Sequence, residues 1–147
     1  MDSLTNLVLP NEIFFGISQE ILQSKQKIRI VLKGDSMKPV LRDGDILTLK
    51  RLGKQNLFLG DIVLAIWNDK FVLHRIVLIK KNTVFLAGDN NLIQIEKVNR
   101  QNVLAKVYQY SRAGKGFKEL SAFHKMLGLF WFACRPFRIA IKRLFKN

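Results

Sequence analysis

Short apolar runs separated by turn residues fill the middle of this chain, and they restrict it to a mainly β fold. "KIRIVLK" at 27–33 alternates apolar and basic residues, which is typical of a half-buried strand. Five further runs rich in β-branched or aromatic residues follow, at 45–52, 61–67, 71–79, 83–87 and 103–110. Because the gaps between them are short and carry Gly, Asn and Asp, we expect hairpins that join 61–67 to 71–79 and 71–79 to 83–87.

The segments on either side of these runs have a different character. Residues 12–24 carry apolar side chains at helical spacing behind Asn11, a plausible N-cap, and predict one short helix. This helix and the six strands would form a β-rich domain over residues 1–110. Residues 111–122 have the composition of a basic, Gly-containing linker, and 123–147 form a basic, aromatic tail.

The composition limits the classes of partner and cofactor. The 147 residues include 25 Lys and Arg but only 11 Asp and Glu, so the formal charge of +14 favours an anionic partner. Cys134 is the single cysteine, which excludes an intrachain disulfide and zinc sites with several cysteines. We expect no metal and no cofactor. The N-terminus lacks the basic start of a signal peptide, and no apolar run is long enough to span a bilayer.

One stretch, "GDSMKPVLRDGD" at 34–45, combines turn-forming residues with a serine. Ser36 follows the first predicted strand directly. A tight turn after a strand can expose a hydroxyl and direct nearby backbone N–H groups at one point, as a nucleophile and its oxyanion hole require. Taken alone, however, a serine in such a turn is far more often an ordinary turn residue than a nucleophile.

A nucleophilic serine needs a base, and His74 is the one histidine within the β-rich region. Strand alternation places it on the same face as Val72 and Ile76, and a histidine ring exchanges a proton near neutral pH. Asp89, in the turn "AGDNN" after the strand paired with that of His74, is the carboxylate we expect to orient the ring. Glu96 is the alternative.

Four motifs together carry a resemblance to a known family: "GDSMKPVLRDGDIL", "GDIVLAIW", "LHRIV" and "GDNN". They resemble the serine peptidase clan of type I signal peptidases and LexA-type self-cleaving repressors, over about residues 28–108. The resemblance implies a coiled β-sheet catalytic domain with Ser36 as nucleophile. The histidine in "LHRIV" is similar to the Ser/His branch found in endoplasmic-reticulum and archaeal signal peptidases, and implies His74 as base.

The resemblance also suggests roles for residues around the serine. Gly34 and Asp35 are candidates for the oxyanion turn, Met37 for the side of the substrate groove, and Pro39 for fixing the turn. Gly34 stands where many signal peptidases carry a second serine, so backbone N–H groups such as that of Ser36 would hold the oxyanion. We expect positive φ angles and turn-stabilising carboxylates at five further motif positions, Gly44, Gly60, Asp43, Asp45 and Asp61.

The tail combines aromatic and basic residues at helical spacing. Pro136 suits the first turn of a helix, in which Phe137 and Ile141 would lie opposite the basic side chains. Such a helix is typical of in-plane attachment to an anionic membrane surface. The candidate membrane residues are Trp131, Arg135, Arg138, Lys142 and Arg143. Packing of the tail on the β core, or on a protein or nucleic acid partner, is the alternative.

These features lead to one functional hypothesis and two alternatives. We expect a serine endopeptidase that cleaves a leader or signal-type peptide while attached peripherally to a membrane, on its cytoplasmic side. A catalytically inactive peptide-binding module of the same fold is the first alternative. A LexA-like regulatory protein is the second, although the residues before Gly34 are too few for a helix-turn-helix domain, so we do not expect a nucleic acid partner.

Overall fold

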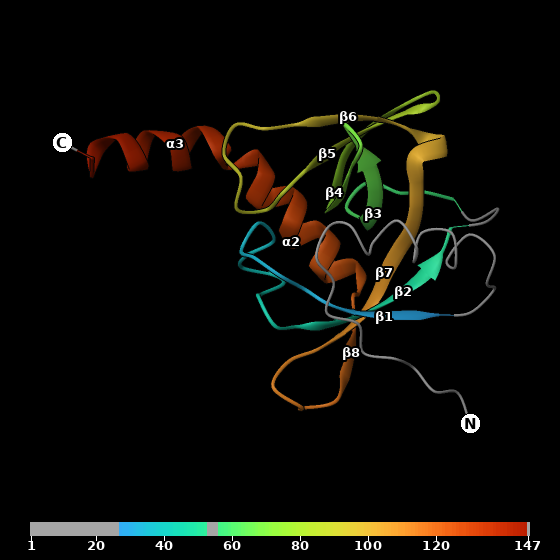
Figure 1. Cartoon of the computed structure of the whole chain (residues 1–147). Coiled ribbons are helices and arrows are strands. Elements are labelled where there is room, and N and C mark those ends of the chain that lie inside the picture. Colours follow the sequence, from blue (N-terminus) through green and yellow to red (C-terminus); the bar gives the residue numbers. More distant parts are fainter. Residues whose placement is uncertain (1–26, 53–55, 147) are drawn as a thin grey trace.

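The computed structural model describes residues 27–52 and 56–146, so the helix predicted at 12–24 lies outside the described residues. Most of the described chain is β structure, followed by two helices (Figure 1). The strands are β1 (Ile28–Val31), β2 (Ile46–Arg51), β3 (Ile62–Trp67), β4 (Lys70–Lys80), β5 (Thr83–Ala87), β6 (Glu96–Asn99), β7 (Val103–Ser111) and β8 (Phe117–Glu119). A 3₁₀ turn, η1 (Arg100–Asn102), precedes β7, and the helices are α2 (Ala122–Ala133) and α3 (Arg135–Leu144).

The strands form one curled antiparallel sheet, a half-barrel, in the order β1-β2-β7-β3-β4-β5-β6, with β8 added to β7. The two predicted hairpins, β3–β4 and β4–β5, are confirmed. Register shifts interrupt the pairing of β2 with β7, of β3 with β7 and of β4 with β5. Such irregularities bend the strands that carry them, which accounts for the curl.

All six predicted strands are present, but β6 and β8 were not predicted. Along β6, Glu96 and Val98 are buried while Lys97 and Asn99 are exposed. The buried and exposed residues therefore alternate as in other strands. Because one of the two buried residues is Glu96, the sequence does not show the alternation of apolar and polar residues that predicts a strand. β8 lies within 111–122, the segment expected to be a linker, and pairs there with the end of β7.

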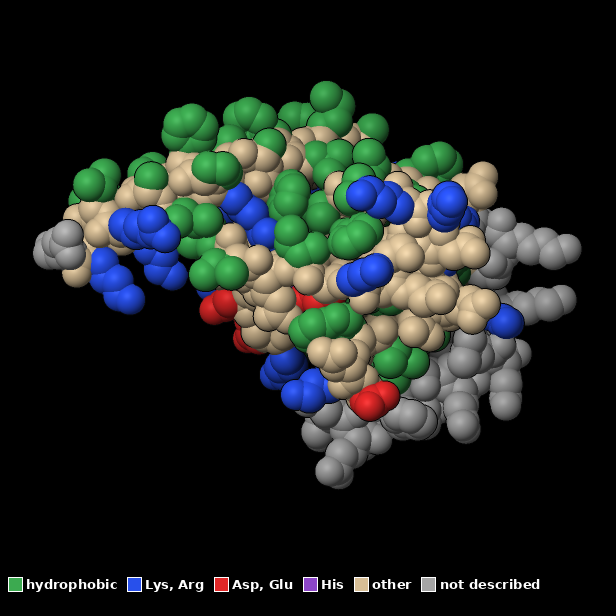
Figure 2. All heavy atoms as spheres, turned by 90° about the horizontal axis from the view of Figure 1, so that it is seen from above, with side chains coloured by type: hydrophobic (Ala, Val, Ile, Leu, Met, Phe, Trp, Pro, Cys, Tyr) green, Lys and Arg blue, Asp and Glu red, His purple; other side chains and the backbone are tan. Residues whose placement is uncertain are grey.

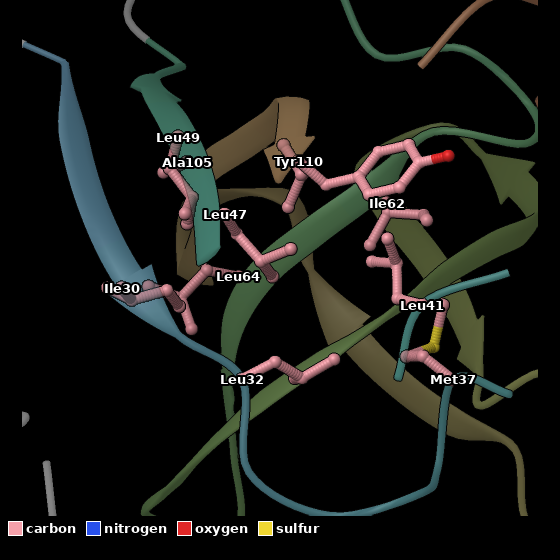
Figure 3. Packing of buried hydrophobic residues seen from close by; sticks show 11 residues of the cluster. Ile30, Leu32, Met37, Leu41, Leu47, Leu49, Ile62, Leu64, Ala105 and Tyr110 are labelled. Atoms are coloured by element: carbon pink, nitrogen blue, oxygen red, sulfur yellow. The ribbon is translucent and has the colours of Figure 1, made fainter. Parts of the chain in front are cut away.

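The central strand β3 is buried on both faces of the sheet. Ile62 and Leu64 belong to one apolar cluster, whereas Val63 and Ala65 belong to a second on the opposite face. Figure 3 shows the first cluster, in which Met37 from the turn after β1 lies beside Leu41 and Ile62. This turn is therefore fixed by the core.

The two C-terminal helices differ in how they meet the sheet. α2 runs across the curled sheet, and α3 continues past its edge as an arm that ends at the C-terminus (Figure 1). α2 is held by the ion pair between Lys125 and the buried carboxylate of Asp61, with a distance of 2.7 Å. None of the helices in the described part of the chain is long and apolar enough to cross a membrane.

Candidate active site

The turn after β1 exposes Ser36 and is held in place by a hydrogen bond, an ion pair and core packing. Gly34, at φ +90°, donates its backbone N–H to Asp43 Oδ1 at 2.7 Å, and Asp35 forms an ion pair with Lys38 at 2.9 Å. Met37 is completely buried in the core. Its apolar packing anchors the turn, in the same cluster as Leu32 and Leu64, and a position beside the substrate groove stays a prediction. Its neighbours Ser36 and Pro39 remain exposed.

The other turn residues behave as predicted. Gly44 and Gly60 have φ angles of +86° and +88°, a region that favours glycine. Asp45 accepts a hydrogen bond from the backbone N–H of Arg42 at 2.8 Å, and Asp61 accepts one from that of Phe58 at 2.9 Å. These carboxylates satisfy turn backbone and do not point at Ser36.

His74 meets Glu96 across the sheet. Ile76 on β4 lies opposite Leu86 on β5, which lies opposite Glu96 on β6, so these residues share a face. His74 is two residues before Ile76 and projects to the same face. Its Nδ1 lies 2.9 Å from Glu96 Oε2, and the two side chains are 12% and 1% exposed. With the carboxylate ionised, the ring donates from Nδ1 and leaves Nε2 as an acceptor.

Asp89 has a different partner. Its two carboxylate oxygens accept hydrogen bonds from Arg75 Nε at 2.8 Å and Nη2 at 2.7 Å, and both side chains are buried. Ala87 pairs with Arg75, so alternation puts Asp89 on the face of Arg75, opposite that of His74. The expectation that Asp89 orients His74 is therefore wrong, and Glu96, the alternative, holds that position.

The serine turn and the histidine come together at Gly88, a residue that the sequence analysis did not single out. A Cβ atom at this position would lie 2.8 Å from the Ser36 carbonyl oxygen and 3.1 Å from His74 Nε2. The same segment is tied to the serine turn, because Asn90 donates its N–H to the Ser36 carbonyl at 2.9 Å. The Ser36 hydroxyl itself makes no hydrogen bond to a described residue.

Ser36 lies between two hollows of the surface. One, of about 320 Å³, is an apolar groove between β1 and the first half of β4 that also holds His74. The other, of about 540 Å³, lies between the segment 90–93 and α3. Ser36 lines both, so a chain crossing the serine would enter one hollow on each side.

Several tail residues expected to face a membrane instead support this site. Arg138 donates to the backbone carbonyl of Asp89 at 3.0 Å and stacks on Trp131, with its guanidinium 4.1 Å from the ring centre. Arg135 is buried and donates to the carbonyl of Gln94 at 3.2 Å. Burial lowers the pKa of both arginines, whose guanidinium groups nevertheless stay charged. The expectation of membrane contact is therefore wrong for the buried Arg135, and for the half-buried Arg138 it stays a prediction.

The curled half-barrel, with an exposed serine close to a histidine that is paired to a buried carboxylate, is an arrangement typical of serine peptidase domains. The comparison with family models agrees: the model described as Peptidase S24-like matches residues 6–108, and the chain belongs to this family. The expected relationship to the LexA and signal peptidase clan is thereby confirmed at the level of the clan. No curated protein matches the chain.

Proposed function

We propose that this protein is a serine endopeptidase of the Ser/His type, in which Ser36 is the nucleophile, His74 the base and Glu96 the residue that orients the base. The observation that carries the proposal is the pairing of His74 Nδ1 with the buried Glu96, which directs Nε2 toward the segment beside Ser36. Buried carboxylates that hold an imidazole in this way fix its tautomer and stabilise the imidazolium formed during catalysis.

The reaction follows from this arrangement. Ser36 Oγ attacks the peptide carbonyl while His74 Nε2 takes its proton, and the backbone N–H of Ser36 stabilises the oxyanion. The imidazolium then protonates the leaving amine, which leaves an acyl-enzyme that water hydrolyses. The missing hydrogen bond between Ser36 and His74 is consistent with this scheme, because such bonds often tighten only when substrate is bound.

The groove beside His74 suits an extended peptide. Among the described strands β1 pairs only with β2. β1 and the first half of β4 flank the groove, whose lining includes Leu32, Leu64 and Phe71. An extended chain could add backbone hydrogen bonds to a strand edge there and place small or apolar side chains in the groove. A leader or signal-type segment has this character.

We also place the reaction at a membrane surface. α3 exposes Phe137, Ile141, Leu144 and Phe145, which are 53–86% accessible, on one side. Figure 2 shows hydrophobic side chains along one edge of this arm and Lys and Arg on the other. An exposed apolar face with basic flanks is the pattern of an interfacial helix, and the net charge of +14 favours an anionic leaflet.

A fluorophosphonate probe, which reacts with activated serine hydroxyls, tests the proposal. We expect the wild-type chain to be labelled at Ser36, Ser36→Ala to be unlabelled, and His74→Gln to react at least about 100-fold more slowly. Cleavage of leader-type peptides should follow the same order. If wild type is unlabelled, or if Ser36→Ala cleaves these peptides equally well, the endopeptidase proposal fails and a peptide-binding module remains.

A further inference from the structure

The larger hollow beside Ser36 has one uncharged wall and one wall that is mainly basic. Asn90, Asn91, Leu92 and Ile93 form one wall. The other wall is formed by Ile139, Lys142 and Arg143 of α3 and by Lys146 just after this helix. The hollow thus offers apolar contacts and three cationic side chains next to the nucleophile. Nothing in the proposed reaction at Ser36 and His74 uses these cations.

The three cations are available for a ligand. Among the residues that the structure describes, none of the ion pairs includes Lys142, Arg143 or Lys146. This contrasts with Arg135 and Arg138 on the same helix, which bind backbone carbonyls of the segment 89–94. Three unpaired cations around one hollow repel one another and gain stability when an anion enters.

The position of Arg143 separates the hollow from the surface that would meet lipid. At 3.6 residues per turn, Ile139 and Arg143, which line the hollow, fall on the side of α3 opposite Phe137 and Ile141, and Lys142 lies between the two sides. An interfacial helix resting on its apolar face would turn this basic side away from the bilayer and toward Ser36. The geometry favours a ligand that also reaches the serine, which is the peptide substrate.

We propose that the hollow is a specificity subsite for acidic side chains of the peptide. It would bind Asp or Glu on the side of the scissile bond opposite the segment held in the apolar groove. Lys142, Arg143 and Lys146 would supply charge-assisted hydrogen bonds to the carboxylates. This inference rests on the proposed peptide site but not on catalysis, because binding alone reveals the preference.

The test is a capture experiment with the intact chain carrying Ser36→Ala, which binds peptides without cutting them. The probe is a peptide library made from a whole proteome with a protease that cuts after aromatic residues, and bound peptides are identified by mass spectrometry. We expect Asp and Glu to be enriched among them. The charge-reversed variant Lys142→Glu/Arg143→Glu/Lys146→Glu should lose this enrichment and select Lys and Arg instead, a change of roughly tenfold or more in relative recovery.

A charge-matched control is essential because the chain has a net charge of +14 and attracts any acidic peptide weakly. The variant Lys80→Glu/Lys115→Glu/Lys118→Glu makes the same change in net charge at exposed positions outside the hollow. It should keep the acidic preference. Equal acidic enrichment in the control and the charge-reversed variant, or none in the parent, would overturn the proposal.

Vesicles provide the remaining arm of the test. If the charge reversal at Lys142, Arg143 and Lys146 abolished sedimentation with vesicles of anionic phospholipid but left peptide selection unchanged, the hollow would be a headgroup site and the substrate proposal would be wrong. The wild-type chain could instead fail to react with the fluorophosphonate probe while capture still enriches acidic peptides. In that case the proposed catalysis would be wrong and the proposed subsite would be supported.

Discussion

His74 and Arg75 are neighbours on β4 whose side chains leave the sheet on opposite faces. His74 pairs with Glu96 beside the serine, while Arg75 pairs with Asp89 beneath α2. The two carboxylates are both buried but serve different purposes. In the proposed reaction Glu96 faces a ring that gains and loses a proton, whereas Asp89 neutralises a cation that remains charged in the interior. Substitution should therefore separate activity from stability.

Replacing each carboxylate by its amide tests this separation. Glu96→Gln removes the charge that supports the imidazolium, so we expect labelling of Ser36 to slow by roughly 100-fold or more. Asp89→Asn leaves Arg75 without a counter-charge and should destabilise the fold by about 3 kcal/mol. Labelling rates and chemical denaturation measure the two effects. The proposal that Glu96 orients His74 would be wrong if the folded Asp89→Asn variant were labelled more slowly than the Glu96→Gln variant.

Gly88 provides a second prediction at this scale. A methyl group there would press on the Ser36 carbonyl and on His74 Nε2, at 2.8 and 3.1 Å. Gly88→Ala should displace one of them, and a shift near 1 Å can reduce the rate about 100-fold. We expect slow labelling of a folded protein. Thr83→Ala, at the other end of β5, is the control and should react like wild type.

The motifs allowed the sequence to indicate Ser36 and His74, but not the partner of the histidine. Asp89 was favoured because the motif "GDNN" follows the strand paired with that of His74. Counting residues back from the turn at Lys81-Asn82 places Asp89 opposite His74. The register shift between Ile76 and Leu78 moves the pairing by one residue and assigns Asp89 to the face of Arg75 instead. Glu96 required knowledge of β6, whose one inward carboxylate conceals the strand.

At the scale of elements, α2 contacts the sheet through a residue without a side chain. A Cβ atom at Gly128 would overlap the Cζ and Nε atoms of the Arg75 guanidinium. The guanidinium therefore fills the space that a side chain would take, and donates to the carbonyls of Gly60 and His124 at 2.8 and 3.5 Å. The contact joins the helix to the strand that carries His74.

Gly128→Ala tests this contact. Alanine favours helix by about 1 kcal/mol over glycine in isolation, yet here the methyl group must displace Arg75 or lift α2. We expect a net destabilisation of roughly 1–3 kcal/mol, measured by denaturant unfolding. Met126→Ala, on the exposed side of α2, is the matched control and should change the free energy of unfolding by less than about 0.5 kcal/mol. A more stable Gly128→Ala protein would contradict the tight contact.

The elements that the sequence predicted well are those whose signal is local. Alternating apolar residues located the six strands, and turn residues located the hairpins. β8 is short and fully exposed, so no burial pattern marks it. The start of α3 also has a local signal, because Pro136 lies in the first turn of this helix, as the sequence predicted.

Considered as a whole, the molecule separates an apolar surface from a basic one across α3. The apolar residues continue onto the exposed side of α2, where Phe123, Met126 and Phe130 are 67–70% accessible. Burying large side chains of this kind in a bilayer interface stabilises attachment by up to about 1.5–3 kcal/mol each. Attachment should therefore depend chiefly on these residues and less on charge.

The variant Phe137→Gln/Ile141→Gln/Phe145→Gln tests this dependence. We expect its binding to anionic vesicles to fall by roughly 100-fold or more, with little change in the free energy of unfolding because these side chains are exposed. Leu78→Gln/Phe117→Gln, which removes exposed apolar residues elsewhere, is the control and should bind normally. Undiminished sedimentation of the α3 variant would refute membrane attachment through this face.

The contact between Gly128 and Arg75 also bears on how this domain can be excised for experiments. The family match ends at residue 108, which suggests a natural place to truncate. Cutting there would remove α2, whose Gly128 packs on Arg75 and whose Lys125 pairs with Asp61. It would also remove Arg135 and Arg138, which bind the segment 89–94. The smallest piece expected to express as a soluble, reactive protein therefore extends through Arg138, about thirty residues past the boundary that the family defines.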